Sequence, residues 1–453
     1  MKKSIPNEAF KWLELLLQER FGHSFTLRDH AQGLSSISWS NDDRSITLAA
    51  DPDTFTRTDS DLPCTQWNAN AEGWHTALPG KLPAPGAAQL PARLIAATVR
   101  GWHIGYDILG LAYWMLTRQE EVGRSDLDNH GRFPSTASHA YKHDYLVRPI
   151  VDEWLQVLGQ VIQRQWPSCR LKMHEFHVKV SHDVDQPSLY AFTPWRTIVR
   201  MMAGHLLKRR DLRAFVQAPY VKLATRSELL EADPYNTFDW VMDVSDQNNM
   251  QSAFYFLCGR TNAIYDADYE LEHPAIRKLM RRIHERGHEI GLHPSYDTYQ
   301  NPHALKLEAE KLKRVCGEEG IEQAQWGGRM HYLRWKQPDT PRAWEQAGLD
   351  YDSSLGYADR PGFRCGTCFE YPGFDPVSGE GLQLRVRPLV MMESSLLDST
   401  YLGLGASHEA TAMALALKDA CRRVRGEFSL LWHNSTFFLP EHRKMYVEIL
   451  KSP

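Results

Sequence analysis

The chain has 453 residues, 42% of them hydrophobic, and a formal charge of −4 at neutral pH. This length can form one large hydrophobic core or two smaller ones, and we expect two domains. The small net charge creates no global field that would attract nucleic acid, so we expect no nucleic-acid partner. Electrostatic recognition must therefore be local.

The chain starts with MKKSIPNEAFKWLELLLQERFG, in which apolar residues recur at helical spacing. Glu14, Glu19 and Arg20 interrupt the apolar run that a secretory signal would need, so we expect an amphipathic helix. No apolar run approaches the roughly 20 residues of a membrane span. These features predict a cytoplasmic protein that is soluble or peripheral to a membrane.

Residues 1–170 are expected to form a smaller α/β or α+β accessory domain. Residues 105–124 and 151–166 have strong helical patterns, whereas residues 50–95 are rich in Pro, Asp, Thr and Gly and predict loops with short strands. A polar loop between the two helices contains Asp128, His130, Arg132 and Phe133. Either a structural hydrogen-bonded role or a substrate contact fits these four residues.

From residue 171 to the end, residue 453, short β-rich runs alternate with helical patterns. The runs are EFHVKVSHDVD, QSAFYFLCG, HEIGLHPS, AQWGGRMHYL, YDSSLG, RVRPLVMMESS and FSLLWHN. Strands separated by helices predict a parallel sheet, either open or closed into a barrel. Catalytic residues of such folds gather at the carboxyl ends of strands, where this chain has many of its Asp and His residues.

An insertion at about residues 195–230 interrupts this alternation. It is rich in Arg and Lys and has almost no acidic residues, and residues 198–216 can form one amphipathic helix. Two interpretations remain open. The segment is either a solvated face, or a peripheral contact with an anionic membrane surface or an acidic substrate carrier.

The run VKVSHDVDQP contains the first candidate catalytic pair. The strand period of two places Asp183 and Asp185 on one face. One carboxylate at a strand end can bind a metal while its neighbour takes a proton from a water molecule that the metal activates. A pair of this kind can also simply cap the following turn.

The run HEIGLHPSYDTY supplies a second candidate element. Pro294 suits the first position of a helix, and a helical turn there would bring His293 close to Asp297. Imidazole and carboxylate are both good ligands for zinc and similar divalent ions. A capping or core role for His293 is the competing interpretation.

Two further runs, GGRMHYLRW and LLWHNSTF, contain Arg329, His331 and His433. Arg329 can hold an aspartate through bidentate hydrogen bonds and keep it ionised. His433 can donate a proton to a leaving amine, because imidazole titrates near neutral pH. Together with Asp183 and a metal, these residues could hydrolyse an amide.

Taken in order, SHDVD, GHEIGLHPSYD, RMHY and LLWH resemble the motifs of the NodB homology domain of carbohydrate esterase family 4, over about residues 174–440. The resemblance implies a distorted (β/α) barrel of about seven strands. It implies that Asp183 is the catalytic base, that Arg329 orients it, that His433 is the general acid, and that the backbone N–H of Tyr332 helps to form an oxyanion hole.

The resemblance also implies a divalent metal, zinc first, with cobalt, nickel or manganese as alternatives. Asp185 and His293 occupy two ligand positions of the family. The third ligand, normally the second histidine of an HxxxH pattern, falls on Asp297. Either Asp297 or the imidazole of His331 would then complete the ligand set.

More closely, GLHPSY, RMHYLRW, YDSSLGYADRPGFRCGTC and LLWHNS, together with HGRFP and RPIVDEW, resemble a two-domain bacterial subgroup associated with surface-polysaccharide synthesis. This implies metal-dependent removal of an N-acetyl or O-acetyl group from a sugar in O-antigen or capsule biosynthesis. The partner would be an acetylated sugar or a carrier-linked oligosaccharide. Two alternatives are an inactive carbohydrate-binding homologue and an amidohydrolase that acts on a non-sugar amide.

Overall fold

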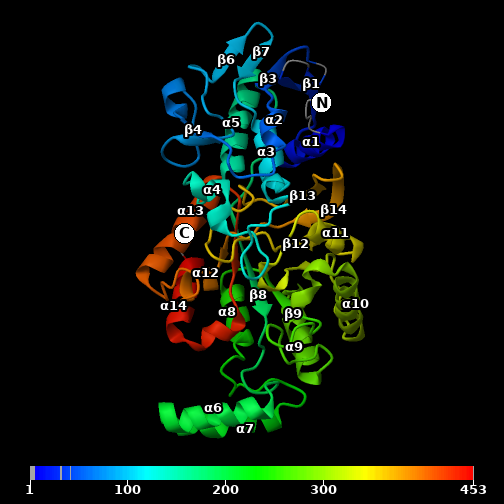
Figure 1. Ribbon diagram of the computed structural model, residues 1–453, viewed down its shortest axis with the longest axis vertical. Coiled ribbons are helices and arrows are strands. Elements are labelled where there is room, and N and C mark those ends of the chain that lie inside the picture. The colour runs from blue at the N-terminus through cyan, green and yellow to red at the C-terminus, as the bar shows by residue number, and fades with distance from the viewer. Residues whose placement is uncertain (1–5, 31–32, 41, 452–453) are drawn as a thin grey trace.

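The computed structural model describes residues 6–30, 33–40 and 42–451. The molecule is elongated, with a small sheet from the N-terminal part at one end and a helical hairpin at the other (Figure 1). A large sheet with its helices lies between them. The described residues therefore show the mixed α/β architecture that the alternating patterns predicted.

The N-terminal part contains a five-stranded sheet in the order β1-β2-β3-β7-β6. Its strands are β1 (Phe25–His30), β2 (Leu34–Trp39), β3 (Ser45–Ala49), β6 (Ile95–Thr98) and β7 (Gly101–Ile104). A two-stranded sheet adds β4 (Cys64–Trp67) and β5 (Leu82–Pro85). The helices are α1 (Asn7–Phe21), α2 (Pro52–Phe55), α3 (Ile108–Leu116), α4 (His139–Lys142) and α5 (Ile150–Gln165). The three longer helices occur where the apolar spacing predicted them.

The N-terminal part shares its hydrophobic core with the rest of the chain. The cluster that contains α1, α3 and α5 also contains Trp335, Tyr357 and Phe374 from the later sequence. The indole N–H of Trp12 donates to the carbonyl of Pro372 at 2.9 Å, which ties α1 to the second part. The two parts are therefore packed together, and the division into domains at residue 170 stays a prediction.

The large sheet has the order β13-β14-β12-β11-β10-β9-β8-β16-β15. Every neighbouring pair is parallel except β13 and β14. The strands are β8 (His177–Val184), β9 (Ser252–Leu257), β10 (Glu289–His293), β11 (Gly327–Gly328), β12 (Tyr351–Asp352), β13 (Tyr371–Asp375), β14 (Glu380–Val386), β15 (Met391–Met392) and β16 (Glu427–Leu431). The predicted parallel sheet is confirmed.

Strand pairing alone does not close this sheet into a barrel. The stretch from β14 to β15 pairs first with β12, through Val386 opposite Asp352, and then with β16, through Met391 opposite Leu430. No pairing between the two outermost strands is recorded among the described residues. The closed barrel of about seven strands therefore stays a prediction.

Helices from the second part cover the large sheet and bury its apolar side chains in one extensive cluster. They are α8 (Phe238–Gln247), α9 (Pro274–Glu285), α10 (Pro302–Glu318), α11 (Asp339–Gln346), α12 (Glu393–Leu397), α13 (His408–Arg423) and α14 (Pro440–Lys451). In α9 the buried residues Ile276, Leu279, Met280 and Ile283 recur every three or four positions, which is the spacing of one helical face.

The insertion differs from its prediction. The expected single helix over residues 198–216 is instead a hairpin of α6 (Trp195–Gly204) and α7 (Leu212–Ala224), joined through a π-helical turn at His205–Arg209. Arg210 takes a left-handed conformation with φ 53°, which ends the first helix. Asp211 then caps the second helix, because its carboxylate accepts a hydrogen bond from the Ala214 N–H.

Within the described part of the chain, we find no helix with both the length and the apolar character needed to cross a membrane.

Candidate active site

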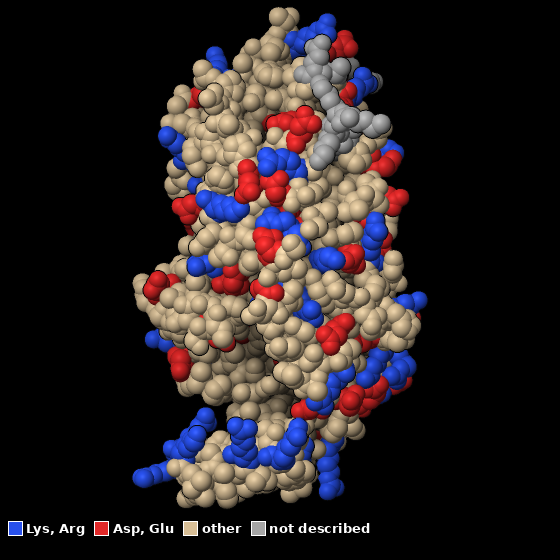
Figure 2. Space-filling view, in the orientation of Figure 1, with Lys and Arg blue, Asp and Glu red and all other residues tan. Residues whose placement is uncertain are grey.

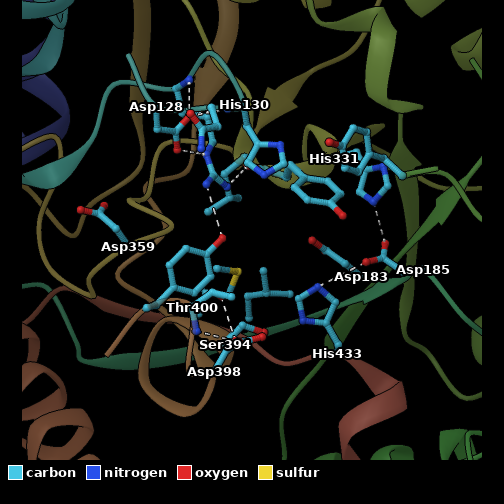
Figure 3. A pocket seen from close by; sticks show the side chains of 18 of the residues that line it. Asp128, His130, Asp183, Asp185, His331, Asp359, Ser394, Asp398, Thr400 and His433 are labelled. Carbon is cyan, nitrogen blue, oxygen red and sulfur yellow. Dashed lines mark hydrogen bonds and ion pairs between the residues drawn. The ribbon is translucent and has the colours of Figure 1, made fainter. Parts of the chain in front are cut away.

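A cavity of about 690 Å³ opens at the carboxyl ends of the parallel strands. Asp183 is in β8, Asp185 follows that strand directly, and His293 ends β10. His331 follows β11, and His433 follows β16. All five side chains line the cavity, and Figure 3 shows those of Asp183, Asp185, His331 and His433 converging on it. Parallel strands bring distant segments together at one edge of the sheet.

Three of these side chains form a group that could hold a metal ion. One ligand atom each from Asp185, His293 and His331 lies within 4.8 Å of the other two. Asp185 Oδ1 is 3.2 Å from His293 Nε2 and 3.6 Å from His331 Nε2. Ligand atoms about 2 Å from a central ion would be separated by similar distances.

Hydrogen bonds fix the orientation of both histidines. His293 Nδ1 lies 2.7 Å from the carbonyl oxygen of Arg329, which can only accept, so this nitrogen carries the proton. His331 Nδ1 lies 3.0 Å from a carboxylate oxygen of Asp266 and is oriented in the same way. Both rings therefore present Nε2 to the shared point, as metal-binding histidines held by outer hydrogen bonds do.

The group leaves one buried atom unsatisfied. Asp185 Oδ1 is buried and has no hydrogen-bond partner among the described residues. The lone pair on His293 Nε2 faces this oxygen, so two electron-rich atoms meet at 3.2 Å. A cation between them would remove this conflict, and the residues present therefore fit a divalent metal.

The local electrostatics favour positive charge at the same point. Burial lowers the pKa of His331, but the carboxylates of Asp185 and Asp266 outweigh burial and raise the pKa to about 9. Burial likewise raises the pKa of Asp185, but the charge of His331 outweighs burial and holds this pKa well below its ordinary value. A proton or a metal cation would satisfy the same electrostatic demand.

Asp183 is held by a buried arginine. Arg329 Nη1 donates to Asp183 Oδ1 at 2.8 Å, and both side chains are almost fully buried. The guanidinium also donates to the Ser353 carbonyl and to the hydroxyl of Ser181, which fixes its plane. Because Arg329 occupies Oδ1, Oδ2 is the oxygen of Asp183 that remains available for a proton.

His433 is paired with a carboxylate. Glu393 Oε1 accepts hydrogen bonds from Nδ1 of His433 at 2.6 Å and from its backbone N–H at 3.0 Å. Burial lowers the pKa of His433, but Glu393 outweighs burial and, with Asp185 and Asp183, raises the pKa to about 10. His433 Nε2 lies 3.6 Å from Asp185 Oδ2, at the edge of the candidate metal group.

The backbone around Tyr332 is strained. Tyr332 has φ 61° and Leu333 has φ 55°, and such left-handed conformations cost free energy for residues other than glycine. Arg132 stabilises this bend, because its Nη1 donates to the carbonyl of Tyr332 at 2.9 Å. Tyr332 lines the cavity, next to His331.

Asp297 does not join the metal group. Its side chain is half exposed, accepts a hydrogen bond from Asn262 Nδ2 at 3.3 Å, and lies 3.8 Å from Arg334 Nη1. The expected helical turn after His293 is a 3₁₀ helix over Tyr296–Gln300. This helix begins after His293, and Ser295 between them has an extended backbone, so His293 and Asp297 do not share a helical turn. His331, and not Asp297, therefore belongs to the candidate metal group.

Two acidic residues of the site, Glu393 and Asp266, lie outside the sequence motifs. Glu393 follows β15 directly, and β15 lies next to β16 in the sheet. The rule that functional residues follow parallel strands could therefore have identified Glu393. Asp266 lies outside any helix or strand and has no periodic signal around it. Only the packing of its loop against His331 reveals its position.

The polar loop of the N-terminal part also reaches the cavity, which Asp128, His130 and Arg132 line. Figure 3 shows the side chains of Asp128 and His130 there. These residues make internal bonds as well. Arg132 Nε donates to Asp128 at 2.7 Å, and His130 Nδ1 lies 2.8 Å from the Tyr296 hydroxyl. The loop is therefore an ordered wall of the cavity, and its contact with substrate stays a prediction.

Three comparisons with known proteins complete this description. A family of unknown function (DUF7033) matches residues 3–167. No curated protein matches the chain. The family match therefore covers the N-terminal part of the chain and not the part that contains the candidate metal group.

Among solved structures, the chain is similar to two proposed polysaccharide deacetylases. One is from Mycobacterium smegmatis, at 16% identity and a TM-score of 0.40, covering 62% of this chain and 84% of that one. The other is from Pseudomonas aeruginosa PAO1, at 14% identity and a TM-score of 0.35, covering 61% and 84%. Puue allantoinase is similar at 12% identity and a TM-score of 0.36, also covering 61% and 84%.

Proposed function

We propose that this protein is a metal-dependent hydrolase that removes an acetyl group from an acetylated sugar. One observation carries the proposal: a candidate metal group, a carboxylate base and a carboxylate-paired histidine line one cavity. The motifs SHDVD, GHEIGLHPSYD, RMHY and LLWH, which resemble those of carbohydrate esterase family 4, support the choice of an acetylated sugar.

Asp185, His293 and His331 would hold the metal, and zinc suits one carboxylate and two imidazoles, with cobalt, nickel and manganese as alternatives. A divalent ion bound there would polarise the acetyl carbonyl and lower the pKa of a water molecule. Asp266 and the Arg329 carbonyl keep the Nε2 atoms of the two histidines directed at this position.

Asp183 acts as the base in this mechanism. Its Oδ2 accepts the proton of the attacking water, while the hydrogen bond from Arg329 keeps the carboxylate oriented. The water oxygen forms a bond to the acetyl carbon. The backbone N–H of Tyr332 is suited to stabilise the negative charge on the former carbonyl oxygen, because Tyr332 lines the cavity beside His331.

His433 acts as the acid. Glu393 raises the pKa of His433 enough to keep the ring protonated at neutral pH, despite burial, which lowers this pKa. Nε2 then donates its proton to the sugar amine as the carbon–nitrogen bond breaks, which releases acetate. For an O-acetyl group, the same proton would go to the sugar hydroxyl.

The walls of the cavity are suited to a sugar. Tyr265, Tyr332 and Tyr401 line it, and aromatic rings provide flat apolar surfaces with polar edges. Asp128, Asp359 and Asp398 add carboxylates that can accept hydrogen bonds from sugar hydroxyls. We extend the proposal to an acetylated sugar or carrier-linked oligosaccharide of O-antigen or capsule biosynthesis, on the resemblance of the sequence to that bacterial subgroup.

The test is acetate release from a panel of N- and O-acetylated sugars, supplied free, nucleotide-linked and lipid-linked, with zinc, cobalt, nickel or manganese. The proposal predicts acetate from at least one sugar, a dependence on added metal, and no release by Asp183→Asn. If the protein binds sugars but releases acetate from none, it is a carbohydrate-binding homologue. If it hydrolyses only cyclic amides, the sugar assignment is wrong.

A further inference from the structure

The hairpin formed by α6 and α7 has two faces of different character. Its inner face packs against residues 189–192, which precede the hairpin, and together they form a small separate core. The buried members of that core are Tyr190, Ala191, Ile198, Ala218 and Val221. The hairpin is thus an ordered element, and Figure 1 shows it projecting from the end of the molecule opposite the N-terminal sheet.

The outer face of the hairpin exposes large apolar side chains. In α6 and the turn these are 41% to 78% exposed, namely Trp195, Val199, Leu206 and Leu207. In α7 they are 56% to 66% exposed, namely Leu212, Val216, Tyr220 and Leu223. Along α7 the spacing of three to four residues places them on one helical face. Exposed apolar side chains that cluster on one helical face are typical of interaction surfaces.

The same hairpin also carries many basic side chains. Residues 195–224 contain seven arginines and lysines and a single acidic residue, Asp211. Apart from Lys222, which donates to the Ala191 carbonyl, no hydrogen bond or ion pair is recorded for these basic side chains within the described residues. Figure 2 shows blue side chains along the hairpin, with tan surface between and beyond them.

We propose that this hairpin docks on the surface of an anionic lipid bilayer. Its apolar face would enter the headgroup region, and the arginines and lysines of the hairpin would contact lipid phosphates. Helices that lie on membranes combine an apolar face containing Trp and Leu with a face rich in Lys and Arg. Anionic lipid is the partner that complements both properties, whereas an aqueous role explains the charges but not the exposed apolar side chains.

The hairpin is anchored beside the catalytic cavity. Asn434 follows His433, and its side-chain amide donates to the carbonyls of Gln186 and Tyr235, both at 2.9 Å. These two residues flank the insertion on either side. Docking would therefore hold the cavity near the bilayer, where a lipid-linked sugar is presented. This orientation rests on the proposed function, whereas lipid binding does not.

Lipid binding is tested by co-sedimentation of the full chain with vesicles of phosphatidylcholine alone or mixed with phosphatidylglycerol. We expect binding to the anionic vesicles, weaker binding at high salt, and little binding to the neutral vesicles. Replacing Arg200, Lys208, Arg209 and Arg210 together by alanine should weaken binding about tenfold or more. Replacing Val199, Leu207, Val216 and Leu223 by serine should do the same.

Two control variants carry changes of the same kind elsewhere on the surface, four basic residues in one and three apolar residues in the other. In the first, alanine replaces Lys11, Arg44, Lys306 and Arg423. In the second, serine replaces the exposed residues Val99, Leu307 and Val377. Circular dichroism verifies that each variant folds. Equal sedimentation with neutral and anionic vesicles, or unchanged binding by both hairpin variants, would overturn the proposal. A different result would identify a second copy of the chain as the partner. In that case the parent protein would not bind lipid and would be a dimer in gel filtration, and the serine variant would be a monomer.

Discussion

The carboxylate of Glu393 accepts a hydrogen bond from Nδ1 of His433 at 2.6 Å, and it is fully buried. This pairing orients the imidazole so that Nε2 points toward Asp185. It also stabilises the charged form of His433 against the effect of burial. The role of His433 as the acid therefore depends on Glu393, which follows β15, whereas His433 follows β16.

Replacing Glu393 by glutamine should lower kcat, because the neutral amide no longer stabilises a protonated His433. We expect a loss of about 100-fold, within the range of general acid catalysis, with bound metal unchanged. Acetate release and metal content measure the two effects separately. Glu427→Gln is the matched control, since Glu427 lies at the opposite end of β16, pairs with Lys179 and is not among the residues that line the cavity. Equal losses in both variants would argue against the pairing.

Asp183→Asn should abolish turnover and retain metal. The amide cannot accept the proton of water at neutral pH, while Arg329 and the three candidate ligands remain in place. A loss of about 100-fold to 10,000-fold is expected for a general base. Kinetics combined with elemental analysis of the purified protein provides the measurement. Turnover at the parent rate would exclude Asp183 as the base.

The third metal ligand can be identified by comparing His331→Ala with Asp297→Ala. His331 lies in the candidate metal group, whereas the half-exposed Asp297 contacts Asn262 and Arg334. We expect the first variant to lose metal affinity by about 100-fold or more and the second to keep it. Isothermal titration with zinc distinguishes the two. The reverse pattern would assign the ligand to Asp297.

Arg132→Ala should impair catalysis without removing metal. The change frees the carbonyl of Tyr332 and the carboxylate of Asp128, which Arg132 now holds at 2.9 Å and 2.7 Å. Relaxation of the strained Tyr332 backbone should reduce kcat/KM by about tenfold.

The control for Arg132→Ala is Arg124→Ala. Arg124 pairs with Asp126 in the same part of the chain and is not among the residues that line the cavity. Its replacement should leave kcat/KM near the parent value. If the two variants lose activity equally, the effect comes from the stability of the loop rather than from its contact with Tyr332.

The sequence by itself determined the elements that depend on local pattern. Alternation of apolar and polar residues along β8 identified the strand that contains Asp183 and ends just before Asp185. The rule that functional residues follow parallel strands pointed to His293 and His433. The parallel sheet followed from the regular alternation of strands and helices. Such inferences succeed because a side chain's direction in a strand depends only on its neighbours.

Tertiary structure decided which distant groups meet. His331 rather than Asp297 belongs to the candidate metal group, because the backbone is extended at Ser295 and no helical turn joins His293 to Asp297. Glu393 reaches His433 across 40 residues, and Arg132 reaches Tyr332 across 200. These contacts arise from the packing of whole strands and loops, which no local periodicity encodes. The same holds for the insertion, where a left-handed Arg210 turns one expected helix into a hairpin.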